Sequence, residues 1–161
     1  MTTLVTGAIG FIGEALCREV QHRALAFRAA RRSPGSGANQ ILIGSVGANA
    51  DWREALMGCE TVIHLAALAH RPVGRETRVL PALRATNVDG VLNLAQQAAD
   101  AGVRRFVFIS SVKVNGEATL PGQVFTAADV PAPLDAYGVS KMEAEQGLRH
   151  IAEQTLLGLH F

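Results

Sequence analysis

A tyrosine and a lysine with helical spacing are the residues of this sequence best suited to proton transfer. They are Tyr137 and Lys141, four positions apart in the run YGVSK. Residues at i and i+4 of a helix share one face, so the phenol and the ammonium are expected to point the same way. A nearby ammonium favours phenolate and should lower the pKa of Tyr137, and a ribose held by Lys141 would set that phenol beside a nicotinamide ring. The pair predicts a tyrosine that acts as acid or base; an ordinary surface pair is the alternative.

Ser111 is the candidate partner of this pair. It follows an apolar run at residues 105–109 that predicts a buried strand. Ligands bind at the carboxyl ends of the strands in parallel sheets of this kind, so Ser111 is expected at that edge. Its hydroxyl would donate a hydrogen bond to the reacting oxygen and help Tyr137 to move a proton.

A glycine-rich turn near the N-terminus predicts a binding site for a pyrophosphate. Gly7, Gly10 and Gly13 form a GxxGxxG pattern between an expected strand and an expected helix. The first glycine allows a tight turn, the second lets the main chain approach the phosphates, and the third lets the helix pack on the strand. Free N–H groups and the helix dipole favour negative charge there. This context favours a dinucleotide site over an ordinary glycine turn.

Two arginines bear on the choice between NAD and NADP. NAD sites usually carry an acid about 20 residues after the glycine turn, where it binds the ribose 2′-hydroxyl. Here the second expected strand runs into Arg31 and Arg32, with no acid. An arginine can pair with a 2′-phosphate, so the sequence slightly favours NADP; a solvated basic loop is the alternative.

Short apolar runs alternate with helical patterns along the chain. Strands are expected at residues 2–6, 24–30, 40–43, 61–65 and 105–109, and helices at 11–20, 52–57, 80–101 and 136–148. Residues 33–37 and 115–133 predict loops by their glycine and proline content. Continuously apolar strands are typical of a parallel sheet covered by helices. The sequence therefore predicts an α/β, Rossmann-like doubly wound sheet, with residues 1–161 as one dinucleotide-binding domain.

The composition limits the classes of partner. The chain has 161 residues, 48% of them hydrophobic and 18% charged, with a net charge of +1. Such a chain is expected to fold, and no charge excess attracts nucleic acid or an anionic membrane. Cys17 and Cys59 lack the spacing of a metal or redox motif, which predicts reduced thiols in a cytoplasmic protein without a metal site. Glycines break the first apolar run, so neither a signal peptide nor a membrane span is expected.

Several motifs make the sequence similar to a known family. In chain order they are TGAIGFIG from Thr6, HLAA from His64, NVDG from Asn87, RRFVFISS from Arg104, VNGE from Val114 and YGVSK from Tyr137. They resemble the extended short-chain dehydrogenase/reductases, the NAD-dependent epimerase/dehydratase family, and among these most of all the nucleotide-sugar 4-epimerases. The matches span nearly the whole chain and keep the family's order.

The resemblance implies a role for each matching residue. Tyr137 is expected to be the acid/base, Lys141 to hold the cofactor ribose and tune Tyr137, and Ser111 to assist them. Asn87 is expected to support the helix and the active site, and His64 to be structural. The other residues expected at the NAD(P) cofactor are Gly7, Gly10, Phe11, Ile12, Gly13, Arg31, Arg32, Leu65, Ala66 and Ala67.

The sequence departs from the family at two places. Ser45 stands where many members carry an aspartate that binds the adenine amine. The chain is also expected to stop at Phe161, where a sixth strand and an arginine–proline segment should begin, and so to lack most of the substrate-binding part. An uncovered sheet edge and apolar surface would favour a homo-oligomer, with the helices at 80–101 and 136–148 as the family's usual dimer face.

Three functional hypotheses remain open at this point. The first is an epimerase, dehydratase or reductase that moves a hydride between NAD(P) and a nucleotide-sugar. The second is a non-catalytic dinucleotide-binding or sensor protein of the same fold. The third is a hydroxysteroid or flavonol-type reductase, which would carry the same motifs. Ser111, Tyr137 and Lys141 favour catalytic ancestry, and whether this chain is itself active stays open.

Overall fold

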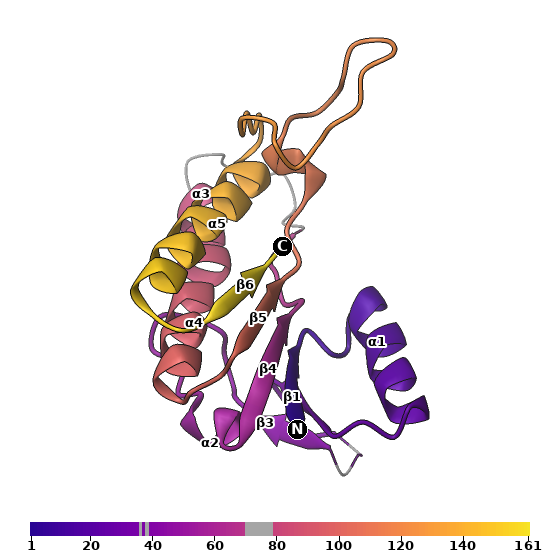
Figure 1. Ribbon diagram of the computed structural model, residues 1–161, viewed down its shortest axis with the longest axis vertical. Helices are drawn as coiled ribbons and strands as arrows, with labels where there is room; N and C mark the ends of the chain where they lie inside the picture. The colour runs from indigo at the N-terminus through magenta and orange to yellow at the C-terminus, as the bar shows by residue number, and fades with distance from the viewer. Residues whose placement is uncertain (36, 38, 70–78) are drawn as a thin grey trace.

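A parallel sheet forms the centre of the fold in the computed structural model, which describes residues 1–35, 37, 39–69 and 79–161 (Figure 1). Its six strands are β1 (Thr2–Thr6), β2 (Phe27–Arg31), β3 (Gln40–Leu42), β4 (Cys59–His64), β5 (Arg105–Phe108) and β6 (Gly158–His160). Their order is β3-β2-β1-β4-β5-β6, and every neighbouring pair is parallel. This is the doubly wound order, in which the chain builds outward from β1 in one direction and then in the other. The predicted fold class is confirmed.

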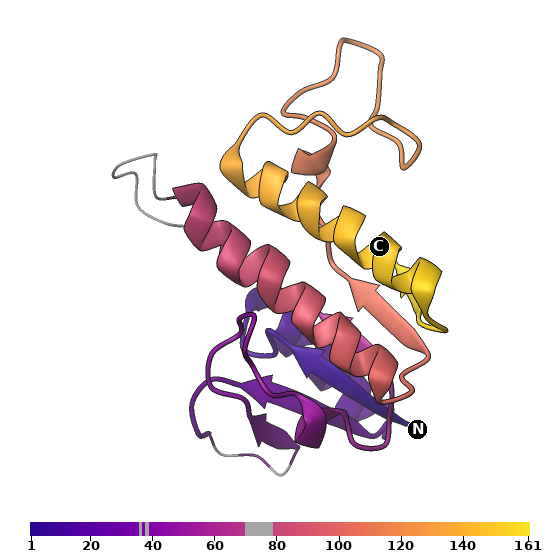
Figure 2. The same cartoon turned by 90° about the vertical axis from the view of Figure 1, so that its left-hand side faces the viewer.

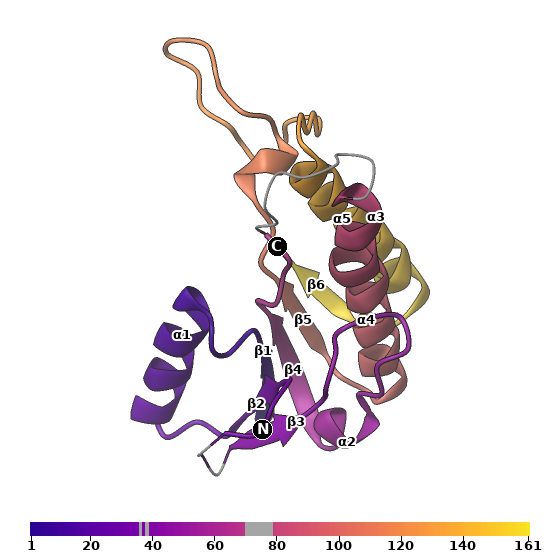
Figure 3. The same ribbon diagram turned by 180° about the vertical axis from the view of Figure 1, so that it is seen from behind.

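Helices cover the two faces of the sheet unequally. They are α1 (Phe11–His22), α2 (Arg53–Leu56), α3 (Val79–Arg84), a π-helical turn η2 (Ala85–Asp89), α4 (Gly90–Asp100), a 3₁₀ turn η3 (Val112–Val114) and α5 (Ala136–Gln154). Helix α1 lies on one face, against β1 and β2, while α3, η2 and α4 form one continuous helical segment that lies beside α5 on the other face (Figures 2 and 3). Residues between η3 and α5 project beyond the carboxyl ends of the strands (Figure 1).

Two apolar clusters follow from the alternation of side chains along the strands. Leu4 points into the larger cluster, which lies between the sheet and helices α2, α4 and α5. Val5 points into the smaller one, with Ala8, Phe27 and Ala29, and packs under α1. Leu4, Val5 and Phe106 are fully buried, so β1 and β5 are central strands, as their continuously apolar sequences predict.

Some helices and strands begin or end at other residues than expected, because contacts with the rest of the fold determine where they start and stop. The second strand begins at Phe27 and not at Ala24, because Ala24 has a φ of 53° and belongs to the turn that ends α1. Helix α5 continues to Gln154, six residues past the expected end. The expected single helix at 80–101 runs from Val79 to Asp100 and contains the π-helical turn η2. Hydrogen bonds in a π-helix span five residues and not four, which changes which side chains face inward there.

One expectation about the C-terminus is wrong. The chain does not stop short of a sixth strand, because residues 158–160 form β6. This strand pairs in parallel with β5, with Leu159 opposite Phe106. The edge of β5 that was expected to be uncovered is therefore paired.

No helix in the described part of the chain is long and apolar enough to cross a membrane. Cys17 is half-buried and Cys59 is buried, and both are free thiols.

The turn between β1 and α1 depends on two glycines. Gly7 has a φ of +68°, and a Cβ there would lie 2.6 Å from the main-chain nitrogen of Ala66. A Cβ on Gly13 would overlap the carbonyl oxygen of Gly7. The helix can therefore approach the end of β1 only with glycine at both positions.

We expect Gly13→Ala to lower the free energy of unfolding by about 3 kcal/mol, because backbone rather than a flexible side chain must move to admit the methyl group. The matched control is Gly47→Ala, since a Cβ at Gly47 meets nothing within 4 Å. That variant should stay within about 0.5 kcal/mol of the parent. Chemical denaturation of the three proteins measures the difference, and equal stability of both variants would show that the close approach is not a constraint.

Candidate functional site

A crevice of about 470 Å³ opens at the carboxyl edge of the sheet. It begins at the β1–α1 turn, passes the ends of β2, β3 and β4, and reaches the π-helical turn η2. The residues that line it are Thr6, Gly7, Ile9, Gly10, Ala30, Arg31, Arg32, Ile43, Gly44, Ser45, Val46, Trp52, Leu65, Ala66, Ala67, Leu68 and Thr86. Loops that follow neighbouring parallel strands meet at this edge, which explains why distant segments line one cavity.

The middle of the crevice is suited to an anion. Gly10 is the N-cap of α1 and has no side-chain cap, and Glu14 N–H is the first to bond back, to Gly10 O at 2.9 Å. The N–H groups of the first helical turn therefore have no helical acceptor. Together with the dipole of the 12-residue helix they favour a phosphate group beside Gly10.

Two arginines and a serine stand at the end of the crevice next to β2 and β3. Arg31 is the last residue of β2, and its Nη1 donates to the side-chain oxygen of Gln40 at 2.9 Å when the Gln40 amide is oriented to accept. Arg31 Nε is buried and has no partner among the described residues. Arg32 and Ser45 line the same end. This end of the crevice therefore carries hydrogen-bond donors, two of them cationic.

Asn87 joins the floor of the crevice to α5. Its Oδ1 accepts from Leu68 N at 2.8 Å, and its Nδ2 donates to Leu68 O and to Ser140 Oγ, both at 3.1 Å. The side chain is only 2% exposed. Ser140 Oγ in turn donates to Tyr137 O at 2.8 Å. Asn87 thus fixes the segment after β4 relative to the first turn of α5, the kind of support that the resemblance implied for it.

Lys141 reaches from α5 to the carboxyl end of β5. Its Nζ donates to Ile109 O at 2.7 Å and lies 3.7 Å from the centre of the Phe108 ring. The residue is 2% exposed, and this burial lowers the pKa of its ammonium to about 8. Ser111 lies two residues beyond Ile109 as the N-cap of η3, where its Oγ accepts from Lys113 N at 3.3 Å.

Tyr137 lies in the first turn of α5 and is half-buried. Asp135 caps this helix by accepting from Gly138 N at 2.6 Å. Burial raises the pKa of the Tyr137 phenol, and the charge of Asp135 raises it further. The expected lowering of the Tyr137 pKa by Lys141 is therefore wrong for this structure, where the lysine ammonium is bound to a carbonyl of β5 and the charge that acts on the phenol is negative.

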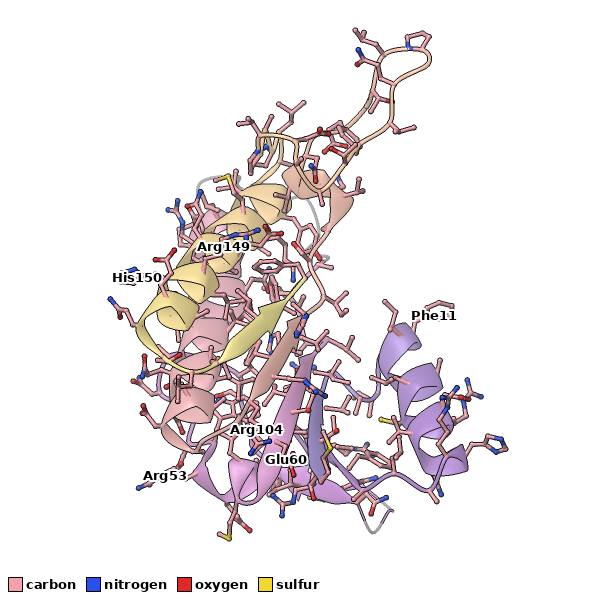
Figure 4. All side chains as sticks on the ribbon, in the orientation of Figure 1. Phe11, Arg53, Glu60, Arg104, Arg149 and His150 are labelled. Carbon is pink, nitrogen blue, oxygen red and sulfur yellow. The ribbon has the colours of Figure 1, made fainter. Side chains whose placement is uncertain are left out.

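The structure brings most of the expected cofactor residues together and leaves a few outside. Gly7, Gly10, Arg31, Arg32, Leu65, Ala66 and Ala67 line the crevice. Gly13 packs behind Gly7, and Asn87 acts through Leu68. Phe11, Ile12, Tyr137 and Lys141 do not line it. Phe11 is 97% exposed at the tip of α1 (Figure 4).

Other lining residues were not singled out from the sequence. Trp52 and Val46 come from the segment between β3 and α2, and Thr86 comes from η2. Their types are those of ordinary core or helix residues, so composition carried no signal for them. The π-helical turn places Thr86 at the crevice and Asn87 behind it, which a regular 3.6-residue pattern does not indicate.

His64 is a buried core residue, in line with the structural role that was expected of it. It is 1% exposed, its Nδ1 lies 2.9 Å from Thr6 Oγ1, and its ring stacks on Phe106 and Phe108. Burial, and to a smaller extent the positive charge of Lys141, lower the pKa of His64 to about 3. The imidazole is therefore neutral in the folded chain at pH 7.

We expect the free energy of unfolding to decrease as the pH falls below about 6.5, where the unfolded chain protonates His64 and the folded chain does not. Between pH 7 and pH 5 this linkage should remove about 2 kcal/mol. In His64→Leu that part of the pH dependence should be absent, whereas the exposed control His22→Ala should keep it. Denaturant titrations at several pH values test this, and equal pH profiles of His64→Leu and the parent would contradict it.

Comparisons with known proteins agree with this geometry. The model of the "NAD dependent epimerase/dehydratase family" matches residues 3–160. The chain is 39% identical over 155 residues to a UDP-glucose 4-epimerase of Vibrio cholerae, covering 94% of this chain and 47% of the epimerase. It is 30% identical over 159 residues to a putative dihydroflavonol 4-reductase of Synechocystis, covering 93% of this chain and 45% of the reductase.

Solved structures give the same result. A short-chain dehydrogenase/reductase superfamily protein from Agrobacterium tumefaciens with bound NAD has a TM-score of 0.84 at 27% identity, covering 99% of this chain and 47% of that chain. MoeE5 in complex with UDP-glucose and NAD has a TM-score of 0.83 at 32% identity, covering 99% of this chain and 52% of that chain. The chain spans about half the length of these relatives. It belongs to the NAD-dependent epimerase/dehydratase family of short-chain dehydrogenase/reductases.

Proposed function

We propose that this chain binds NAD(P) in the crevice at the carboxyl edge of the sheet and provides the cofactor site and the proton-transfer residues of an enzyme that acts on a nucleotide-sugar. One observation carries the proposal: the uncapped N-terminus of α1 and the buried ammonium of Lys141 lie at the same sheet edge, where the strands end. The first suits a pyrophosphate and the second suits the ribose that Tyr137 would need beside it.

The residues present fit the cofactor. Gly7 and Gly10 leave room for phosphates where a side chain would fill the turn, and the first N–H groups of α1 would bind them. Ala66 and Ala67 offer small side chains along the wall after β4. When bound, NAD(P) supplies the hydride acceptor or donor. Relatives of known structure contain NAD, which supports a nicotinamide dinucleotide here.

Proton transfer is assigned to Tyr137. Its phenol would take the proton of a sugar hydroxyl as the carbon below it loses a hydride, and return it in the reverse step. Because its pKa is raised in the structure, the phenol is protonated at pH 7 and serves first as an acid. A cationic nicotinamide ring and a Lys141 ammonium turned toward the ribose would both favour the phenolate needed for the oxidative direction. Ser111 would donate a hydrogen bond to the same substrate oxygen.

The substrate class comes from the relatives. The similarity to the Vibrio cholerae UDP-glucose 4-epimerase and to MoeE5, which binds UDP-glucose, supports a nucleotide-sugar. The weaker similarity to a putative dihydroflavonol 4-reductase keeps a reductase of small carbonyl compounds as the second candidate. Self-association and a cytoplasmic location stay predictions, the former to be checked by light scattering.

We expect Gly10→Asp to abolish NAD binding while it leaves the fold intact. An aspartate at an N-cap accepts bonds from the first-turn N–H groups and stabilises the helix, but its charge repels a pyrophosphate at the same place. Gly10 has φ −83° and ψ 171°, which an aspartate adopts readily, and its Cβ would lie 3.3 Å from Gly7 O, a contact that a shift of a few tenths of an ångström relieves. Calorimetric titration with NAD, with circular dichroism for the fold and Gly47→Asp as control, decides; undiminished NAD affinity in Gly10→Asp would refute the assignment of the crevice.

Tyr137→Phe should bind NAD as the parent does and should lose activity by a factor of about 10²–10⁴, the usual contribution of one acid/base. Reduction of a flavonol-type ketone consumes reduced nicotinamide and is followed by absorbance, whereas epimerisation regenerates NAD in each turnover, so the interconversion of UDP-glucose and UDP-galactose is followed by separating the two sugars. If the parent binds NAD and turns over none of them, the non-catalytic hypothesis is favoured. If Tyr137→Phe is as active as the parent, the role of Tyr137 is wrong.

Cofactor choice depends on Arg31 in this proposal. A charge-assisted bond to a 2′-phosphate contributes about 1.5–3 kcal/mol, so we expect tighter binding of NADP than of NAD by a factor of about ten or more. Arg31→Ala should remove that preference, and Arg23→Ala, which alters an exposed ion pair with Glu19 at the far end of α1, should not. Parallel titrations with NAD and NADP measure the ratio; equal or tighter binding of NAD by the parent would show that Arg31 is a solvated residue.

A further inference from the structure

We propose that Glu145 is a positioning residue for Lys141: fixed by Ser110, its carboxylate keeps the buried lysine charged and directed at the end of β5. This inference rests on the proposed function, because it concerns the residue that would hold the cofactor ribose. Glu145 is a half-buried carboxylate that has no part in the proton transfer described above.

The geometry comes from two consecutive turns of α5 and two consecutive residues of the strand end. Lys141 Nζ donates to Ile109 O, and one turn later Glu145 Oε1 accepts from Ser110 Oγ in a short hydrogen bond. Positions i and i+4 share a helix face, so both side chains point at the same end of β5. The two bonds therefore fix the rotation of α5 relative to β5, and with it the position of the Lys141 ammonium at Ile109.

The carboxylate is sheltered enough to act at short range. The side chain of Glu145 is 15% exposed, and its Oε2 lies 3.7 Å from Arg149 Nη2, whose own side chain is 59% exposed. Arg149 stacks 4.4 Å from the Phe161 ring, which in turn packs edge-on against Phe108. Ser110 Oγ donates to the other carboxylate oxygen, Oε1, so the carboxylate is held between Ser110 and Arg149.

The charge of Glu145 opposes the effect of burial on Lys141. Burial lowers the pKa of the ammonium to about 8, and the Glu145 carboxylate raises it. Without that carboxylate the pKa would fall further, toward neutral pH, and a neutral amine is a poor donor to a ribose hydroxyl. A lysine that must stay protonated in a buried place therefore needs a negative partner, and within the described residues Glu145 is the carboxylate that acts on it.

Other titratable groups around α5 do not replace Glu145. Those on the elements packed against it are Arg84 of α3, Asp89 of η2, Asp100 of α4, Lys113 of η3, Arg105 of β5, His160 of β6 and, on β4 behind the Phe108 ring, His64. His64 is neutral at pH 7 because its pKa is about 3. Lys113 is paired with Glu117 and with Asp135, the carboxylate next to Tyr137, and Arg84 is paired with Glu143.

Glu143 provides a matched control on the same helix. It lies two residues before Glu145, which places it on another side of α5, and it forms an ion pair with Arg84 of α3. Glu143→Gln and Glu145→Gln remove the same charge from the same helix. The control should change neither the charge state of Lys141 nor its position.

The test is a pH titration of Lys141 in the free chain, followed by NMR of lysine labelled with ¹³C at Cε and assigned with Lys141→Met. The parent should titrate with a midpoint at about pH 8. Glu145→Gln should lower the midpoint by roughly one pH unit, Ser110→Ala by less, and Glu143→Gln by nothing measurable. Glu145→Asp, which keeps the charge, should restore part of the shift. This readout requires neither NAD nor substrate.

The second readout is the affinity for NAD as a function of pH. It should fall as the pH rises through the Lys141 midpoint, and in Glu145→Gln it should fall at a pH lower by the same amount as in the NMR titration. An unchanged midpoint in Glu145→Gln overturns the proposal; if that variant does not fold, an unchanged midpoint in Ser110→Ala overturns it. A shifted NMR midpoint without NAD binding by the parent would refute the proposed function and leave the effect of the Glu145 charge on Lys141 in place.

Discussion

The buried amide of Asn87 is the interaction on which the arrangement of the site depends. It bonds to both main-chain groups of Leu68 and to Ser140 Oγ, and so joins three segments that are far apart in the sequence. A buried amide that lost one of these partners would be left unsatisfied at a cost of about 1–3 kcal/mol, so the three segments are held together as a unit. The π-helical turn η2 carries this amide, which is buried between the segment after β4 and α5.

The sheet provides the second constraint. Because the strands are parallel and follow the doubly wound order, their carboxyl ends meet at one edge, and the segments after β1, β2, β3 and β4 line one crevice. The close approach at Gly7 sets how near α1 comes to that edge. The N-terminal N–H groups of α1 and the buried ammonium of Lys141 are then fixed to the same sheet by different halves of the chain. Neither half alone would place a dinucleotide between them.

The sequence predicted those features that depend on local rules. Strands with continuously apolar residues, the glycine spacing and the Tyr–Lys spacing are local, and the fold class that they indicated is confirmed. Features that depend on burial were not predictable in the same way. The pKa of Tyr137 is raised because its environment is partly desolvated and Asp135 caps its helix, and neither fact is visible in the YGVSK run. Strand β6 was missed because its three residues carry too few apolar positions to stand out, and pairing with β5 defines them.

The same residues serve an epimerase and a reductase, and this explains why the relatives include both. Each reaction moves one hydride between a carbon and the nicotinamide and one proton between the attached oxygen and an acid. A crevice for the dinucleotide, a tyrosine, a lysine and a serine meet that need without reference to the rest of the substrate. Relatives with either name match this chain over more than nine-tenths of its length, yet the chain spans less than half of theirs. What separates a nucleotide-sugar from a flavonol is the part of the substrate that does not react. Recognition of that unreactive part therefore has to come from contacts outside the crevice. The proposed hydride and proton transfer would use the same residues of this chain for either substrate.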